Sequence, residues 1–247
     1  MKLIPGPDQV PFFVGRENVV KQVLNEFKDT SKQVHLLCGP GGIGKSQLAV
    51  RLFDALIETG QYSHAFWLNC QTTEQLQIEY KRIAEKISNL HIVDQKDTKL
   101  AIQTIRERIE NERCLLVFDD VAPDRSDVAG FLPRNKGHVI LTSKNSKTTD
   151  WSFDAKHWLI DGLVEEDLMR LAHKFNLSMP DSKDDAKDCM EYLKTEFSGM
   201  PVILAQFFSH CKEMGYYKVA DRIENLRRKQ SQGRNRFLIK NPNKNIT

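Results

Sequence analysis

The segment Gly39-Pro40-Gly41-Gly42-Ile43-Gly44-Lys45-Ser46 decides the fold of this 247-residue chain. It matches the pattern G-x-x-x-x-G-K-[ST] at every position. The short apolar run Val34–Cys38 comes directly before it, and the amphipathic run SQLAVRLF begins at Ser46. This pattern requires a strand before it and a helix after it. We therefore expect the segment to form a tight loop between a strand and a helix.

The chemistry of such a loop is phosphate binding. Its glycines let the backbone wrap round an anion with N–H groups pointing inward, and the helix N-terminus adds partial positive charge. Lys45 is placed to reach the β- and γ-phosphates of a nucleotide, and the Ser46 hydroxyl can ligate Mg²⁺. Lys45 is thus also a catalytic candidate. The nucleotide-binding candidates here are Pro40, Gly41, Gly42, Ile43, Gly44, Lys45, Ser46 and Gln47.

A second apolar run ends in two carboxylates, Cys114-Leu115-Leu116-Val117-Phe118-Asp119-Asp120. The run predicts a buried strand, and Asp119 then lies at its carboxyl end, where ligands bind in open α/β sheets. Asp119 is the candidate Mg²⁺ partner, through water. Asp120 is the candidate catalytic group that orients or deprotonates an attacking water.

Alternation of apolar runs with amphipathic segments predicts a doubly wound α/β domain. Short, continuous apolar runs suit strands of a parallel sheet that is covered on both faces. The five predicted strands are Val34–Cys38, His64–Leu68, Cys114–Phe118, Val139–Thr142 and His157–Ile160.

After about residue 160 only helical stripes remain, and Met179–Ser182 and Ser198–Pro201 form breaks between them. Four short helices are expected in this part. We therefore expect an α/β nucleotide-binding domain at 1–160, an all-α helical domain at 161–229 and a loose basic tail or linker at 230–247.

The formal net charge of +3 is unevenly distributed. The last 21 residues, Arg227–Thr247, contain seven basic side chains and no acidic one, so residues 1–226 carry 29 − 33 = −4. A uniformly basic nucleic-acid-binding surface is therefore disfavoured. Contact with nucleic acid is expected only through the tail, where Arg234, Arg236 and Phe237 give a weak signal.

The cysteines and the N-terminus indicate a cytoplasmic protein. The five cysteines are widely spaced and form no C-x-x-C pair, so neither a disulfide framework nor a zinc site is indicated. The N-terminal sequence MKLIPGPDQV lacks the apolar core of a signal peptide. No stretch approaches the roughly 20 apolar residues that span a bilayer, and we expect no membrane contact.

Two other classes of phosphate-binding protein lack their usual signals. A GTPase usually carries N-K-x-D for guanine, and the nearest match, Asn135-Lys136-Gly137-His138, lacks the aspartate. Adenine is therefore the expected base. A small-molecule kinase usually shows an arginine-rich lid, and no such segment stands out.

Further motifs complete a recognisable order. Phe13-Val14-Gly15-Arg16-Glu17 precedes the phosphate-binding loop by about one helix, Val139-Ile140-Leu141-Thr142-Ser143-Lys144 follows the aspartate-ended strand, and Gly199-Met200-Pro201-Val202 opens a later helix. With the loop and LLVFDD, this order closely resembles the NB-ARC family of STAND P-loop NTPases. The resemblance runs from about Phe12 to Leu226.

The resemblance implies a three-layer fold with a five-stranded parallel sheet in the order 2-3-4-1-5, followed by a small helical domain. It implies that Val14 and Arg16 contact the adenine and that Pro201 packs on the adenine or ribose. Lys144 stands where relatives carry an arginine that detects the γ-phosphate. The lysine ammonium is a point charge, whereas the arginine guanidinium is planar and offers paired donors, so we expect Lys144 to detect the γ-phosphate more weakly.

The chain departs from the family pattern after its last predicted helix. Relatives continue into a winged-helix domain with a Met-His-Asp motif, and that motif does not occur here. We expect either a fragment of a longer protein or a minimal member.

The predicted function is a signalling switch that binds ADP or ATP with Mg²⁺ and hydrolyses ATP slowly. Protein partners, or self-assembly, are expected to act through missing or separate domains. The alternative is an AAA+-like ATPase with sustained turnover, coupled to work on nucleic acid or protein.

Overall fold

A computed structural model describes residues 2–28, 33–88, 102–103, 105, 107, 112–122, 126–133, 137–144 and 153–231. The chain divides into two compact units. The first comprises Met1–Pro11 and Arg16–Ile160, and the second comprises Phe12–Gly15 and the residues from Asp161 on. The expected basic tail lies outside the described residues from residue 232 onward, and so do Asn135 and Lys136.

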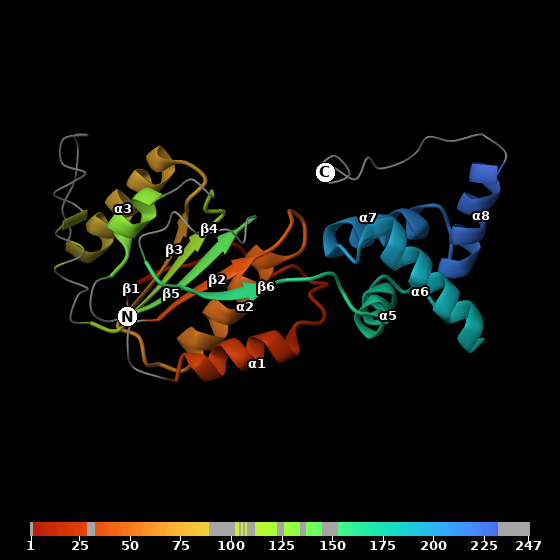
Figure 1. Ribbon diagram of the computed structural model, residues 1–247, viewed down its shortest axis with the longest axis horizontal. Helices are drawn as coiled ribbons and strands as arrows, with labels where there is room; N and C mark the ends of the chain where they lie inside the picture. Colours follow the sequence, from red (N-terminus) through yellow and green to blue (C-terminus); the bar gives the residue numbers. More distant parts are fainter. Residues whose placement is uncertain are drawn as a thin grey trace. The chain divides into compact units, whose positions relative to one another are not determined.

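The first unit is built on a six-stranded parallel sheet (Figure 1). Its strands lie in the order β1-β3-β4-β5-β2-β6. Without β1 this is the predicted order 2-3-4-1-5, which is confirmed, and β5 lies between β2 and β4. The strand bounds are β1 Lys2–Ile4, β2 Gln33–Cys38, β3 His64–Asn69, β4 Cys114–Asp119, β5 His138–Ser143 and β6 Lys156–Leu159.

The prediction of five strands was wrong by one, because β1 was missed. β1 has only three residues and is followed by Pro5 and Pro7, so its own pattern carries no strand signal. It forms because it pairs with β3, with Lys2 opposite His64 and Ile4 opposite Phe66. Ile4 is buried in the main core, and that burial stabilises the short strand.

Helices cover both faces of the sheet, which confirms the three-layer α/β prediction (Figure 1). On one face are α1, Glu17–Glu26, and α2, Lys45–Glu58. On the other is α3, Thr73–Ser88, whose Leu76, Tyr80 and Ile83 are buried against the sheet. A short 3₁₀ helix, η2, spans Ser126–Phe131. The central strands are buried along almost their whole length, as expected for a sheet enclosed on both faces.

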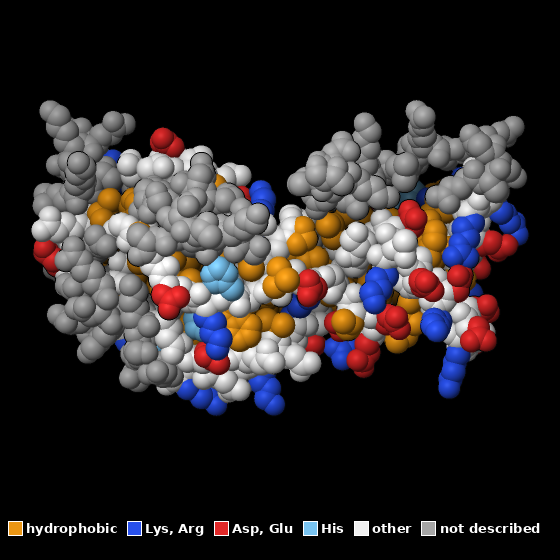
Figure 2. All heavy atoms as spheres, in the orientation of Figure 1, with side chains coloured by type: hydrophobic (Ala, Val, Ile, Leu, Met, Phe, Trp, Pro, Cys, Tyr) orange, Lys and Arg blue, Asp and Glu red, His pale blue; other side chains and the backbone are white. Residues whose placement is uncertain are grey.

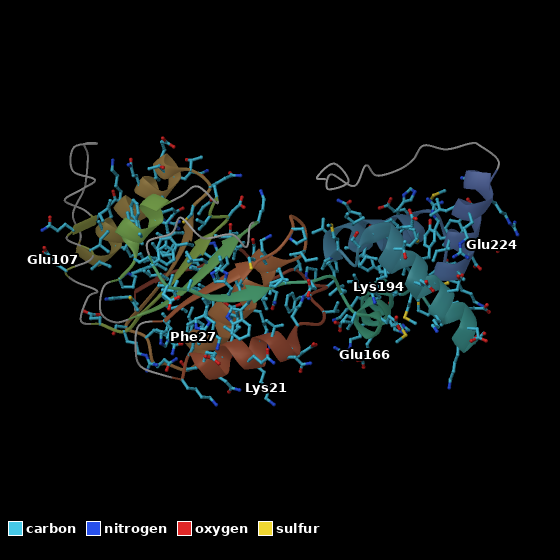
Figure 3. All side chains as sticks on the ribbon, viewed as in Figure 1. Lys21, Phe27, Glu107, Glu166, Lys194 and Glu224 are labelled. Atoms are coloured by element: carbon cyan, nitrogen blue, oxygen red, sulfur yellow. The ribbon has the colours of Figure 1, made fainter. Side chains whose placement is uncertain are left out.

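The second unit contains the helices α5, Glu165–Lys174, α6, Lys183–Phe197, α7, Pro201–Glu213, and α8, Val219–Ser231. Their ends follow the predicted breaks: the Ser182 side chain caps α6, and Pro201 occupies the first turn of α7. Leu168, Leu193 and Phe208 are among the residues of its own apolar core. Acidic and basic side chains are interspersed on the visible face of these helices, and Glu166, Lys194 and Glu224 point outward (Figures 2 and 3).

Two features bear on the expected environment of the chain. All five cysteines are buried, and none of them forms a disulfide. Within the described part of the chain, no helix combines the length and the apolar character needed to cross a bilayer.

Two buried histidines flank Phe27, the residue that follows α1 (Figure 3). The ring centroid of Phe27 lies 4.2 Å from that of His35 and 4.7 Å from that of His138. The Trp158 indole N–H donates to His35 Nδ1 at 2.9 Å, and His35 Nε2 lies 3.2 Å from Gln33 Oε1. A neutral ring with its proton on Nε2 satisfies both contacts, whereas a protonated ring would set two N–H groups against each other.

We expect acid to destabilise the first unit through His35. The pKa of His35 is lowered from 6.5 to about 4, chiefly by burial; Glu26 opposes this shift, and Lys156 and His138 contribute to it. Between these two pH values the unfolded chain binds a proton that the folded chain does not. The free energy of unfolding therefore falls as pH falls through this window, by about 3 kcal/mol at most, and levels off below it.

Urea unfolding near pH 7 and near pH 5 checks this expectation. The matched variant is His35→Asn, which keeps an acceptor for the Trp158 indole but has no proton to gain. It should lose much less stability between the two pH values than the wild type. Equal losses in the two proteins would show that His35 does not carry the effect.

Candidate functional site

The phosphate-binding loop, residues 39–46, joins β2 to α2 as predicted. Gly39 has a φ of 152°, and a Cβ at this position would lie 2.6 Å from the Ile160 carbonyl oxygen, so no side chain fits there. Gly44 caps α2 with a φ of 96°, a conformation that L residues rarely adopt. Both positions therefore require glycine for the loop to connect β2 to α2.

Lys45 is folded onto the loop. Its side chain is buried, and Nζ donates to the carbonyl oxygens of Gly39 at 2.8 Å and Pro40 at 2.9 Å. Burial lowers the pKa of Lys45, while the nearby Asp120 and Asp119 raise it and Lys144 lowers it. The ammonium group is therefore held at the centre of the loop, among charged groups from β4 and β5.

Ser46 and Asp119 come together at the start of α2. The Ser46 hydroxyl donates to Asp119 Oδ1 at 2.8 Å. A hydroxyl and a carboxylate at this distance are hard oxygen donors of the kind that Mg²⁺ takes in phosphate sites, so the residues present fit the expected ion. The described residues contain no cluster of three or more His, Cys, Asp or Glu side chains that could hold a metal. Mg²⁺ in phosphate sites usually needs only one or two protein ligands, because the phosphates and water supply the rest.

Asp120 follows β4 in a left-handed turn. Its φ is 59°, and its backbone N–H donates to Thr142 Oγ1 at 2.9 Å. Its carboxylate pairs with Lys144, whose Nζ lies 3.5 Å from Asp120 Oδ1. The structure thus brings Lys45, Ser46, Asp119, Asp120 and Lys144 to one edge of the sheet.

Arg16 also reaches the loop. It has a φ of 72° at the N-terminus of α1, and its Nη2 lies 3.5 Å from the Ile43 carbonyl oxygen. Gln47 points its side chain elsewhere: it accepts from the Val10 N–H at 2.8 Å and donates to the Asp8 carbonyl oxygen at 3.4 Å. Gln47 therefore fastens an N-terminal segment to α2. Nothing in the sequence pattern pointed to this contact, because Asp8 and Val10 belong to no motif.

Val14 and Pro201 belong to the second unit. Val14 packs against the apolar core of the helices. Two residues earlier, the ring of Phe12 packs on that of Phe175 in a tilted arrangement, with the centroids 4.9 Å apart. Pro201 begins α7. The expected adenine contacts of Val14, Arg16 and Pro201 stay predictions.

The sequence pattern indicated Thr142 only as part of residues 139–144, the sensor segment that ends in Lys144, yet its hydroxyl contacts both acidic residues. It donates to Asp119 Oδ1 at 2.6 Å and accepts from the Asp120 N–H. A signal for this role was present in the sequence. β4 and β5 were expected to be neighbouring parallel strands, and both end in polar residues.

The similarity to known proteins covers most of the chain. The family model described as "NB-ARC domain" matches residues 16–182. Two Arabidopsis thaliana proteins named for disease resistance are 24% identical over 143 residues and 31% identical over 144 residues, each covering 54% of this chain. The matches cover only 17% and 15% of those two proteins, so the chain spans a small part of their length.

Solved structures show the same fold at low identity. A STAND protein with a tetratricopeptide repeat sensor from Pyrococcus horikoshii has a TM-score of 0.54 at 20% identity, covering 80% of this chain and 30% of that one. Cdc6p from Pyrobaculum aerophilum has a TM-score of 0.57 at 14% identity, covering 86% and 65%. DnaA from Aquifex aeolicus, solved with AMPPCP, has a TM-score of 0.52 at 17% identity, covering 90% and 68%.

The family match spans more than half of the chain, from Arg16 at the start of α1 to Ser182 at the cap of α6. It includes the phosphate-binding loop, both aspartates and the sensor segment. The chain belongs to the NB-ARC family of P-loop NTPases.

Proposed function

We propose that this NB-ARC module binds ADP or ATP with Mg²⁺ and acts as a signalling switch, with slow or regulated hydrolysis of ATP. The observation that carries the proposal is the 2.8 Å hydrogen bond between Ser46 and Asp119 at the mouth of the loop. It joins the hydroxyl of the phosphate-binding motif to the carboxylate of the neighbouring motif. Two segments 73 residues apart in the sequence thereby form one site for a metal-bound polyphosphate.

The loop residues would bind the phosphates. Backbone N–H groups of the loop and the positive end of α2 would provide an anion site, and Lys45 would exchange its two carbonyl contacts for phosphate oxygens. Mg²⁺, when bound, neutralises phosphate charge and orients the β- and γ-phosphates. Ser46 and Asp119 would hold it.

Asp120 and Lys144 would distinguish ATP from ADP. Lys144 is largely exposed and already paired with Asp120 at 3.5 Å, so the γ-phosphate would have to compete with that carboxylate. While the pair holds, Lys144 occupies Asp120 Oδ1, so this oxygen is not free to orient an attacking water. This mutual neutralisation supports slow rather than rapid hydrolysis.

A switch also requires two states that bind the two nucleotides with different free energies. The division of the chain into two units offers bodies that such states could rearrange. Partner proteins or further copies of the chain would then respond to the nucleotide. Cysteines that form no disulfide suit a reducing compartment, and we place the module in the cytoplasm.

We expect ADP with Mg²⁺ to raise the thermal melting temperature of the wild type. At about 100 times the dissociation constant, a ligand that binds only the folded state adds about 2.7 kcal/mol, or roughly 5–10 °C for a chain of this size. Lys45→Ala should lose most of this shift. The control is Lys21→Ala, since Lys21 lies on the outer side of α1 (Figure 3). A wild type whose melting is unmoved by either saturating nucleotide would sink the proposal.

Lys144 gives a second test, through the ratio of the dissociation constants for a non-hydrolysable ATP analogue and ADP. Lys144→Ala should weaken ATP-analogue binding about fivefold, the value of one exposed charge contact, and leave ADP binding nearly unchanged. Lys144→Arg should keep the preference. If Lys144→Ala weakened both ligands equally, the residue would not sense the third phosphate.

Turnover separates the switch from the alternative, an AAA+-like ATPase. Phosphate release should be slow, at or below about one event per minute per chain, whereas the median enzyme turns over about 10 times per second. The rate should also be independent of protein concentration. Asp120→Asn should reduce it about 100-fold while ADP still binds. Sustained turnover that rises with protein concentration would favour the alternative.

A further inference from the structure

One hydroxyl group lies between the two acidic residues of the site. Thr142 is next to last in β5, and its register follows from the pairs Phe118 opposite Leu141 and Cys38 opposite Ser143. This register puts Thr142 beside Asp119, at the level where the carboxyl ends of β2, β4 and β5 meet. The Thr142 side chain is 1% exposed, so its polar atom must find its partners within the protein.

Both hydrogen-bonding functions of this hydroxyl are used within the site. Its proton goes to Asp119 Oδ1 at 2.6 Å, and its oxygen accepts from the Asp120 N–H at 2.9 Å. A single atom therefore fixes the carboxylate of one aspartate and the backbone of the next. Valine, with the same shape, would leave a buried N–H and a carboxylate oxygen each short of one partner.

Hydrogen bonds from neighbouring segments fix the turn that contains Asp119 and Asp120. The Cys70 N–H donates to the Asp119 carbonyl oxygen at 2.8 Å, and the Val121 N–H donates to the Thr142 carbonyl oxygen at 2.8 Å. Ser143 Oγ donates to the Val121 carbonyl oxygen at 2.7 Å. Neither Ser143 Oγ nor these backbone bonds touch the Asp119 carboxylate. Ser143 and the backbone bonds thus hold the turn without orienting the Asp119 carboxylate, whereas the Thr142 hydroxyl contacts both that carboxylate and the turn backbone.

The contacts of Asp119 decide which of its oxygens remains for the metal. Ser46 and Thr142 both donate to Oδ1, and Oδ2 accepts no hydrogen bond from any described residue. While the Ser46 proton points at Asp119, the lone pairs of its oxygen remain for another partner. The Thr142 bond opposes rotation of the carboxylate, which would exchange the two oxygens.

We infer that Thr142 is a positioning residue that sets the Mg²⁺ dependence of nucleotide binding, by fixing the Asp119 carboxylate through its hydroxyl. The inference rests on the proposed function, because it needs a bound nucleotide with Mg²⁺. Thr142 contacts neither the phosphate-binding loop nor Lys45 in any described hydrogen bond. Binding of the nucleotide alone should therefore not depend on it.

The experiment measures ADP binding by calorimetry, once in EDTA and once across a series of Mg²⁺ concentrations. Thr142→Val should keep the wild-type ADP affinity in EDTA within about twofold and weaken the apparent Mg²⁺ affinity about tenfold, the usual loss when a group that orients a metal ligand is removed. Thr142→Ser keeps the hydroxyl and should behave like the wild type.

Two further variants separate the hydroxyl from general packing. Thr142→Ala and Thr142→Ser both remove the methyl group, so their difference isolates the hydroxyl even if Thr142→Val folds poorly. Ser143→Ala removes the neighbouring hydroxyl from the same turn without touching the Asp119 carboxylate. We expect it to keep the wild-type Mg²⁺ affinity.

The outcomes distinguish the inference from the proposed function. Wild-type Mg²⁺ affinity in Thr142→Val, or an equal loss in Ser143→Ala, overturns the role of Thr142 and leaves nucleotide binding intact. ADP binding by the wild type that is indifferent to Mg²⁺ overturns it as well. Failure of the wild type to bind ADP in either buffer overturns the proposed function itself.

Discussion

The parallel pairing of β5 between β2 and β4 is the constraint on which the site depends. In a parallel sheet all strands end at the same edge, so three segments distant in the sequence present their last residues together. β2 supplies the loop and α2, β4 supplies the two aspartates, and β5 supplies Thr142 and Lys144. The buried apolar pattern of these strands stabilises the pairing. The polar site is therefore a consequence of how the core is packed.

Much of this arrangement could be predicted from the sequence, because the decisive signals are local. The phosphate-binding motif fixes a strand, a loop and a helix by its glycines and its position, and LLVFDD fixes a second strand with acidic residues at its end. The resemblance to NB-ARC proteins supplied the strand order, which spacing alone could not give. The family and the fold were thus accessible before any coordinates.

The features that escaped prediction depend on tertiary contacts. β1 forms because it pairs with β3 and buries Ile4 there. A run of three residues does not indicate such a tertiary contact in the sequence. The role of Thr142 depends on register, since a shift of one residue would turn its hydroxyl to the other face of the sheet. The Gln47 side chain contacts the backbone of Asp8 and Val10, which no motif indicated, and its expected nucleotide contact stays a prediction. The adenine contacts of Val14 and Pro201 stay predictions, since both residues belong to the second unit.

The two carbonyl contacts of Lys45 have a consequence for the choice of anion. Gly39 and Pro40 already accept two of the three protons of this ammonium group, so an anion that uses those protons must replace two short hydrogen bonds. A polyphosphate can replace those two hydrogen bonds and also interact with the loop, the N-terminus of α2 and the metal ligands. Orthophosphate has only four oxygens, so it forms far fewer hydrogen bonds in place of those that Lys45 gives up. The carbonyl groups of the loop therefore compete with a small anion for Lys45 more effectively than with a polyphosphate.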